Sequence, residues 1–220
     1  MTKTYPTKIN SLLAEEIGLH IGDGCLNYYK GKGFYQLRGH LLEDKDHYLT
    51  RIKPLYERLF GIKVNIRDMK STGVCGFQVW NNKLADYKDR ILNLPLGRKV
   101  NFVIPERILK SKTLSKSFLR GYFDTDGCFY LEKKRHKLYP RVEMASVSKD
   151  FIEQVTTMLR SLGFNFSSYV EIRKHQNWNN LNRIIIRGEK MTDKWFSEIN
   201  PANSKHWKKY QRYKGGPAAI

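Results

Sequence analysis

Two nine-residue stretches decide the fold of this chain: Glu16-Ile17-Gly18-Leu19-His20-Ile21-Gly22-Asp23-Gly24 and Leu119-Arg120-Gly121-Tyr122-Phe123-Asp124-Thr125-Asp126-Gly127. Each ends a run of apolar residues at helical spacing, and each is followed directly by a cysteine. The last aspartates stand at positions 23 and 126, an offset of 103 in a chain of 220 residues. A motif repeated at half the chain length indicates two copies of one structural unit.

The residues between the two motifs predict the same order of elements twice. Apolar periodicity predicts helices at residues 11–23, 44–60, 83–94, 114–126, 148–162 and 191–199. It predicts strands at residues 25–30, 34–42, 62–67, 77–80, 128–134, 139–145, 164–173 and 181–187. Pro54 predicts a kink, and Gly24 predicts a left-handed exit from the first helix.

This order predicts an α+β fold of two tandem α-β-β-α-β-β-α repeats. Each repeat would carry a four-stranded antiparallel sheet with helices on one face and the other face open. The expected divisions are an N-terminal repeat at 1–97, a linker at 98–113, a C-terminal repeat at 114–200 and a basic tail at 201–220.

The charge balance indicates a polyanionic partner. Lysine and arginine total 40 against 21 acidic residues, a formal net charge of +19. Phosphate neutralisation releases condensed counterions, so we expect a nucleic acid; a membrane is disfavoured because no stretch has the length and apolarity of a spanning helix. Three cysteines without a Cys-x-x-Cys pair indicate neither a disulfide framework nor a zinc site.

Small residues within the motifs predict how the repeats meet. Gly18 and Gly22 are four residues apart, as are Gly121 and Thr125, so each pair shares a helix face and permits close backbone packing. That packing would place Asp23 and Asp126 side by side at the negative ends of two helices. Two such carboxylates repel each other, and a divalent cation between them would offset the repulsion and support phosphodiester hydrolysis.

The paired motifs resemble those of the LAGLIDADG homing endonuclease family, in its single-chain, two-motif (pseudo-dimeric) form. The second motif matches at Leu119, Gly121, Asp124, Asp126 and Gly127; the first is looser and keeps Gly18, Leu19, Asp23 and Gly24. The resemblance implies that Asp23 and Asp126 are catalytic and bind Mg²⁺, with help from the carbonyls of Gly22 and Thr125.

The resemblance also implies auxiliary residues at two places in each repeat. A basic residue at the end of the fourth strand would be Lys83 and Lys190, with Arg187 as a rival. At the end of the second strand the family often has Gln, whereas this chain offers Glu43 or Asp44 and, in the other half, Ser146.

Strand alternation predicts which side chains line the open faces of the two sheets, which together would form a DNA-binding saddle. In the first half these residues are Asn27, Tyr29, Gln36, Arg38, His40, Lys63, Asn65, Arg67, Gln78 and Trp80. In the second half they are Tyr130, Glu132, Lys134, Tyr139, Arg141, Glu143, Asn165, Ser167, Tyr169, Glu171, Arg173, Arg183 and Arg187.

The sequence therefore predicts a monomeric, site-specific endonuclease that makes a staggered double-strand break in a long pseudo-symmetric DNA site with Mg²⁺. Two alternatives remain on the same scaffold: a maturase that binds its own intron RNA, and a DNA-binding relative that does not cut. An intein origin is disfavoured because no splicing domain flanks the unit. The expected location is a reducing, intracellular one, the cytoplasm or nucleoid, with an organellar matrix as the alternative.

Overall fold

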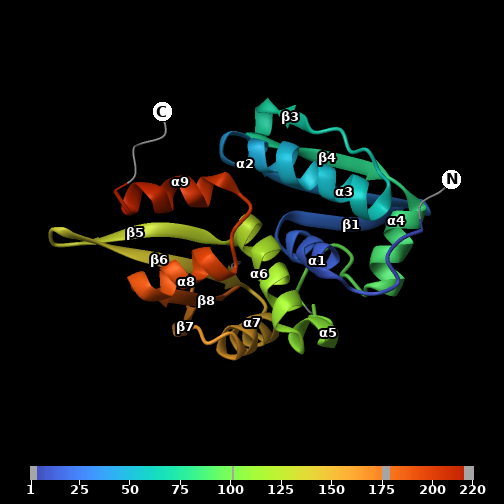
Figure 1. Ribbon diagram of the computed structural model, residues 1–220. Coiled ribbons are helices and arrows are strands. Elements are labelled where there is room, and N and C mark those ends of the chain that lie inside the picture. Colours follow the sequence, from blue (N-terminus) through green and yellow to red (C-terminus); the bar gives the residue numbers. More distant parts are fainter. Residues whose placement is uncertain (1–3, 101, 175–178, 216–220) are drawn as a thin grey trace.

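The computed structural model describes residues 4–100, 102–174 and 179–215. It confirms the predicted α+β fold: two halves, each with a four-stranded antiparallel sheet, in the strand orders β1-β2-β4-β3 and β5-β6-β8-β7. Helices α1 and α6 lie side by side between the halves, and the β5–β6 hairpin projects away from the rest of the second half (Figure 1).

The first half is built on a buried first helix. Its elements are α1 (Ser11–Asp23), β1 (Gly24–Tyr29), β2 (Lys32–His40), α2 (Leu41–His47), α3 (Lys53–Phe60), β3 (Arg67–Met69), β4 (Val74–Trp80) and α4 (Asn82–Asp86). A π-helical turn at Tyr48–Ile52 joins α2 to α3, and another at Tyr87–Ile91 follows α4.

The second half repeats this order and adds a helix to it. Its elements are α6 (Lys112–Asp126), β5 (Cys128–Lys134), β6 (Lys137–Ser146), α7 (Lys149–Ser161), β7 (Phe166–Glu171), β8 (Leu181–Arg187), α8 (Glu189–Glu198) and α9 (Ser204–Tyr213). The short α5 (Glu106–Leu109) lies between the halves. Neither α5 nor α9 was expected from the periodicity.

Several predicted boundaries were wrong for local reasons. The helix expected from residue 44 begins at Leu41, because the His40 side chain accepts a hydrogen bond from the amide of Glu43 and caps it. The strand expected at 62–67 alternates in burial around Val64, but its pairing with β4 begins only at Arg67. Strand alternation with Tyr169 and Glu171 outward would turn Val170 and Ile172 toward the helices, but Val170 of the edge strand β7 and Ile172 just after it are both exposed.

The left-handed exit expected at Gly24 was also wrong. Gly24 has extended backbone angles (φ −75°, ψ 150°), as does Gly127 (φ −88°, ψ 157°). The need for glycine is steric instead: a Cβ at Gly24 would lie 2.7 Å from the backbone of His20, and one at Gly127 would lie 2.0 Å from the Phe123 ring. These glycines let each chain turn sharply from the motif helix into the first strand of its sheet.

The hydrophobic core runs from the first sheet through α1 and α6 to the second sheet. Its centre contains charge. In α1, Glu16 is fully buried and accepts hydrogen bonds from the ammonium of Lys88 and from the hydroxyl of Tyr56 (2.5 Å). The neighbouring Glu15 makes a bidentate ion pair with Arg51 and also reaches Arg120 of α6. The second contact ties the two halves together.

Candidate active site

The two motif helices cross with their backbones in contact. A Cβ on Gly18 would lie 2.2 Å from the Phe118 carbonyl oxygen, and one on Gly121 would lie 2.0 Å from that of Glu15. Further along, a Cβ on Gly22 would lie 1.9 Å from the Thr125 hydroxyl and 3.5 Å from the Asp126 carboxyl carbon. The predicted small-residue packing is therefore present, and it brings the C-terminal ends of both helices together.

Asp23 and Asp126 share this helix junction and influence each other. Burial, followed by the charges of Asp126 and Asp44, raises the pKa of Asp23 to about 7. The hydroxyl of Tyr48 donates a hydrogen bond to Asp23 at 3.4 Å. Asp126 is open to solvent on one side, but the atoms crowding its other side raise its pKa by desolvation. The surroundings of Asp23 and Asp126 therefore disfavour the negatively charged form of both side chains.

Two lysines supply positive charge at this junction. Lys99 and Lys205 both act electrostatically on Asp23 and on Asp126. The Lys99 ammonium donates a hydrogen bond to the Gly22 carbonyl and another, 3.3 Å long, to the His20 carbonyl. Lys205 forms a 2.8 Å ion pair with Asp44. Sequence reasoning assigned neither lysine to the acids, because Lys99 lies in irregular chain and Lys205 lies in α9, a helix that the repeat pattern does not predict.

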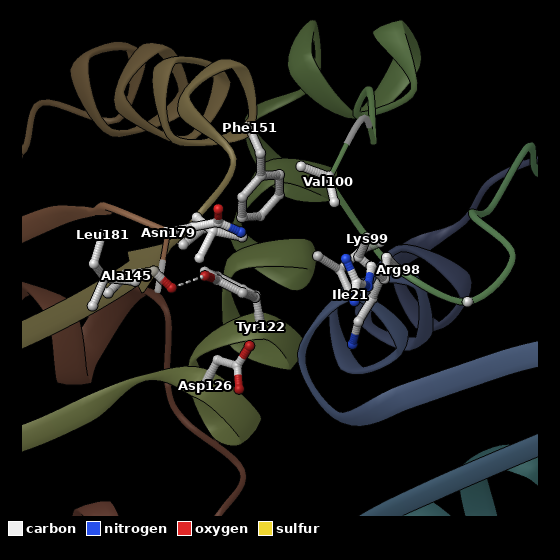
Figure 2. Close-up of a pocket in the computed structure, with 13 residues that line it drawn as sticks. Ile21, Arg98, Lys99, Val100, Tyr122, Asp126, Ala145, Phe151, Asn179 and Leu181 are labelled. Atoms are coloured by element: carbon white, nitrogen blue, oxygen red, sulfur yellow. Dashed lines mark hydrogen bonds between the residues drawn. The ribbon is translucent and has the colours of Figure 1, made fainter. Parts of the chain in front are cut away.

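Lys99 and Asp126 line a cavity of about 510 Å³, which Figure 2 shows between Asp126 and the chain around Val100. Its far wall is formed by Ala145 and Leu181 of the second sheet, and the Tyr122 hydroxyl donates to the Ala145 carbonyl at 2.8 Å. The cavity gives water and small groups access to Asp126 from the side of the second half.

The junction suits a hard divalent cation through oxygen donors. Within residues 4–100, 102–174 and 179–215 no group of three or more His, Cys, Asp or Glu side chains could hold a metal ion. A cation here would therefore use the two carboxylates of Asp23 and Asp126 with backbone carbonyls and substrate oxygens. The Gly22 carbonyl, predicted to help bind the metal, accepts a hydrogen bond from the Lys99 ammonium. The Thr125 hydroxyl donates within its own helix, to the carbonyls of Gly121 and Tyr122.

The structure places the predicted auxiliary lysines elsewhere. Lys83 lies on α4 with its ammonium 4.7 Å from the centre of the Tyr5 ring. Lys190 is exposed in the first turn of α8. Of the residues at the end of the second strands, Glu43 is exposed, Ser146 lies at the end of β6, and Asp44 is buried beside the acids. Of these three, the structure brings Asp44 into the junction.

The strand register places the predicted reading residues on the faces opposite the core. In the first sheet Gln36 opposes both Cys25 and Gln78, and Arg38 opposes Gly76. In the second sheet Arg141 opposes both Tyr130 and Arg187, and Tyr169 opposes Arg183. Lys63, Asn65, Asn165 and Arg173 lie outside the strands.

The two open faces differ in their charge pattern. On the first face the Arg38 guanidinium donates to the Gln78 side chain at 3.2 Å. On the second face Arg183 pairs with both Glu143 and Glu171, and Arg141 pairs with Glu132 at 2.6 Å. A pseudo-symmetric fold therefore carries two chemically different surfaces.

The geometry and the sheet topology define a duplicated α+β fold whose two motif helices meet at an acid pair. The description "LAGLIDADG-like domain" matches residues 113–200, which confirms the resemblance in the half with the closer motif. The first half lies outside that match, in keeping with its looser motif.

Solved structures show the same fold over both halves. The chain is similar to I-DmoI in complex with DNA and Mn, with a TM-score of 0.60 and 19% identity over 86% of this chain and 96% of that one. It is also similar to the N-terminal LAGLIDADG domain of DUF199/WhiA, with a TM-score of 0.55 and 16% identity over 89% and 86% of the two chains. The chain therefore has the LAGLIDADG fold in its single-chain form.

A curated relative shares this region as part of a longer protein. The chain is 27% identical over 190 residues to glutamine–fructose-6-phosphate aminotransferase of Methanocaldococcus jannaschii, covering 84% of this chain and 16% of the relative. The chain spans less than a fifth of the length of the first three curated relatives that it matches. Among the described residues, no helix is long and apolar enough to cross a membrane.

Proposed function

We propose that this chain is a site-specific endodeoxyribonuclease that hydrolyses both strands of a long, pseudo-symmetric DNA site. The observation that carries the proposal is the acid pair Asp23 and Asp126, which lies between the two open sheets with a lysine beside it from each half. A bound divalent cation, Mg²⁺ or a similar ion, would neutralise the scissile phosphate and acidify an attacking water.

The residues of the chain have distinct tasks in this proposal. Asp23 and Asp126 would hold the cation, and either one, when ionised, would accept a proton from the attacking water. The water oxygen would bond to phosphorus as its proton passes to the carboxylate, the bond from phosphorus to one bridging oxygen would break, and that oxygen would take a proton from solvent water. Lys99 and Lys205 stabilise the negative charge that builds on the phosphate. We propose them for this role in place of Lys83 and Lys190, since the charges of Lys99 and Lys205 both act on the two acids.

The net charge of +19 supports a nucleic-acid substrate. The open faces present arginine, amide and acidic side chains, which suit base edges in the major groove. The two faces carry different ion pairs, so the proposed site is symmetric only in outline. Each half would read one side of the site, and the chain would act as a monomer.

The test uses a plasmid library with a randomised insert, incubated with the protein and Mg²⁺. Wild-type protein should yield linear DNA with staggered ends at one family of sequences, and EDTA should abolish the product. Asp23→Asn and Asp126→Asn should lose double-strand cutting but still bind the selected site. Asp150→Asn, an exposed acid on α7, is the matched control and should cut normally. Full double-strand cutting by Asp126→Asn would contradict the assignment.

One observation favours RNA binding as a second candidate function. Tyr29 and Trp80 are 51% and 56% exposed on the open face of the first sheet. Their rings meet Phe34 at centroid distances of 5.6 and 4.8 Å. Unpaired bases stack on such aromatic groups, as single-stranded RNA requires. Specific binding of the adjoining intron RNA, lost in Trp80→Ala and unaccompanied by DNA cleavage, would favour the maturase alternative.

A further inference from the structure

The chain after α8 returns to the first half. Residues 201–203 lead into α9, which lies beside α2 (Figure 1). The buried Asp124 of the second motif fixes this return: its carboxylate accepts hydrogen bonds from the backbone amides of Ala202 (2.8 Å) and Asn203 (3.1 Å). The second half thereby anchors the segment that carries Lys205.

Asp44 of the first half holds the other side of this segment. One carboxylate oxygen accepts from the Asn203 side-chain amide (2.7 Å) and from the Lys205 ammonium (2.8 Å). The other accepts from the backbone amide of His40 (2.7 Å) at the end of β2. Asp44 is 5% exposed and Asn203 is fully buried, so water competes little for these bonds.

The other lysine is held differently. Lys99 donates to the backbone carbonyls of Gly22 and His20. At the repeat offset of 103, the position of Asp44 falls on Val147, which brings no charge to that side of the junction. The two lysines therefore approach the same acid pair with unequal tethers, one a buried carboxylate and the other main-chain oxygens.

We propose that Asp44 is a positioning residue for Lys205, and that cleavage of one DNA strand depends on Asp44 while cleavage of the other does not. This inference rests on the proposed nuclease function. Asp44, whose charge acts on Asp23, fixes the Lys205 ammonium near the acid pair, so its loss releases that lysine and leaves Lys99 in place. The strand served by Lys205 would then be cut slowly, and nicked DNA would accumulate.

The experiment compares Asp44→Asn with Asp46→Asn, a matched control on the same helix whose carboxylate accepts from Ser204 (3.2 Å). The first readout needs no DNA: the side-chain ammonium signal of Lys205 in a nitrogen-15 NMR spectrum. This signal should be protected from exchange in wild type and Asp46→Asn and lost in Asp44→Asn. The second readout is single-turnover cleavage of a selected site, labelled on each strand in turn.

Asp44→Asn should slow one strand by about tenfold or more and leave the other within about twofold of wild type. Equal slowing of both strands, no slowing of either, or a Lys205 signal unchanged by the substitution would overturn the inference. A wild-type protein with a protected Lys205 signal that binds DNA without cutting it would overturn the proposed function instead, together with the strand dependence, and would leave the tether established.

Discussion

Gly18 of α1 and Phe118 of α6 are in backbone contact, with 2.2 Å separating the position of a Gly18 Cβ from the Phe118 carbonyl oxygen. Neither partner is the end of a flexible side chain, so a larger residue can be fitted only by moving one helix. The two helices also carry Asp23 and Asp126. The packing that joins the halves therefore sets the separation of the acids.

We expect Gly18→Ala to lower the free energy of unfolding by about 2–3 kcal/mol, because it forces two backbones apart. Gly73→Ala is the control: it lies in open space at φ +66° and should cost about 1 kcal/mol from backbone strain alone. Urea unfolding of both variants checks the difference. Equal losses would show that the close crossing contributes nothing of its own.

Lys99→Met should reduce the single-turnover cleavage rate by about 100-fold or more and leave binding of the selected site nearly unchanged. The loss follows from removing an ammonium that donates to the Gly22 carbonyl and acts electrostatically on both acids. Lys83→Met and Lys190→Met remove the same charge at a distance from the junction and should cut at wild-type rates. A large loss in either control would restore the assignment expected from the family pattern.

Asp23 should make the stability of the metal-free protein fall as the pH rises. Its pKa is raised from 3.8 to about 7, so between these values the folded chain holds a proton that the unfolded chain releases. The free energy of unfolding is therefore highest, as far as Asp23 is concerned, below about pH 4. It falls as the pH rises toward 7 and the buried carboxyl is forced to ionise. Buried histidines such as His47, with a pKa lowered to about 4, act in the opposite direction, so wild type alone cannot isolate Asp23.

The comparison is therefore wild type against Asp23→Asn in EDTA. The two proteins should be equally stable near pH 4, and Asp23→Asn should be more stable by about 1–3 kcal/mol at pH 8. Mg²⁺ at pH 8 should raise the melting temperature of wild type and leave that of Asp23→Asn almost unchanged. A stability difference that is constant across the pH range would contradict the raised pKa.

The repeat and its small residues were sufficient to predict the fold and the acid pair, because periodicity and glycine spacing report directly on helix packing. The lysines could not be found in this way. Lys99 lies 76 residues after Asp23, whereas Lys205 lies 79 residues after Asp126. The two lysines are therefore not equivalent positions at the repeat offset of 103, and the repeat does not pair them. The buried Glu16–Lys88 ion pair could not be predicted either, because charged residues on helical segments are normally expected to face solvent.

Arg38 offers a test of the open faces as DNA-reading surfaces. Its guanidinium lies on the open face of the first sheet beside Gln78, where it could contact a guanine. Arg38→Ala should weaken binding to the selected site by about 1–3 kcal/mol and relax the base preference at one position, with little effect on non-specific DNA.

Arg107→Ala on α5 removes the same charge from an exposed helix between the halves and should leave both affinities unchanged. Filter binding to selected and scrambled duplexes, at two salt concentrations, separates these outcomes. A uniform loss on all sequences, with a shallower salt dependence, would mean that Arg38 binds phosphate and reads no base.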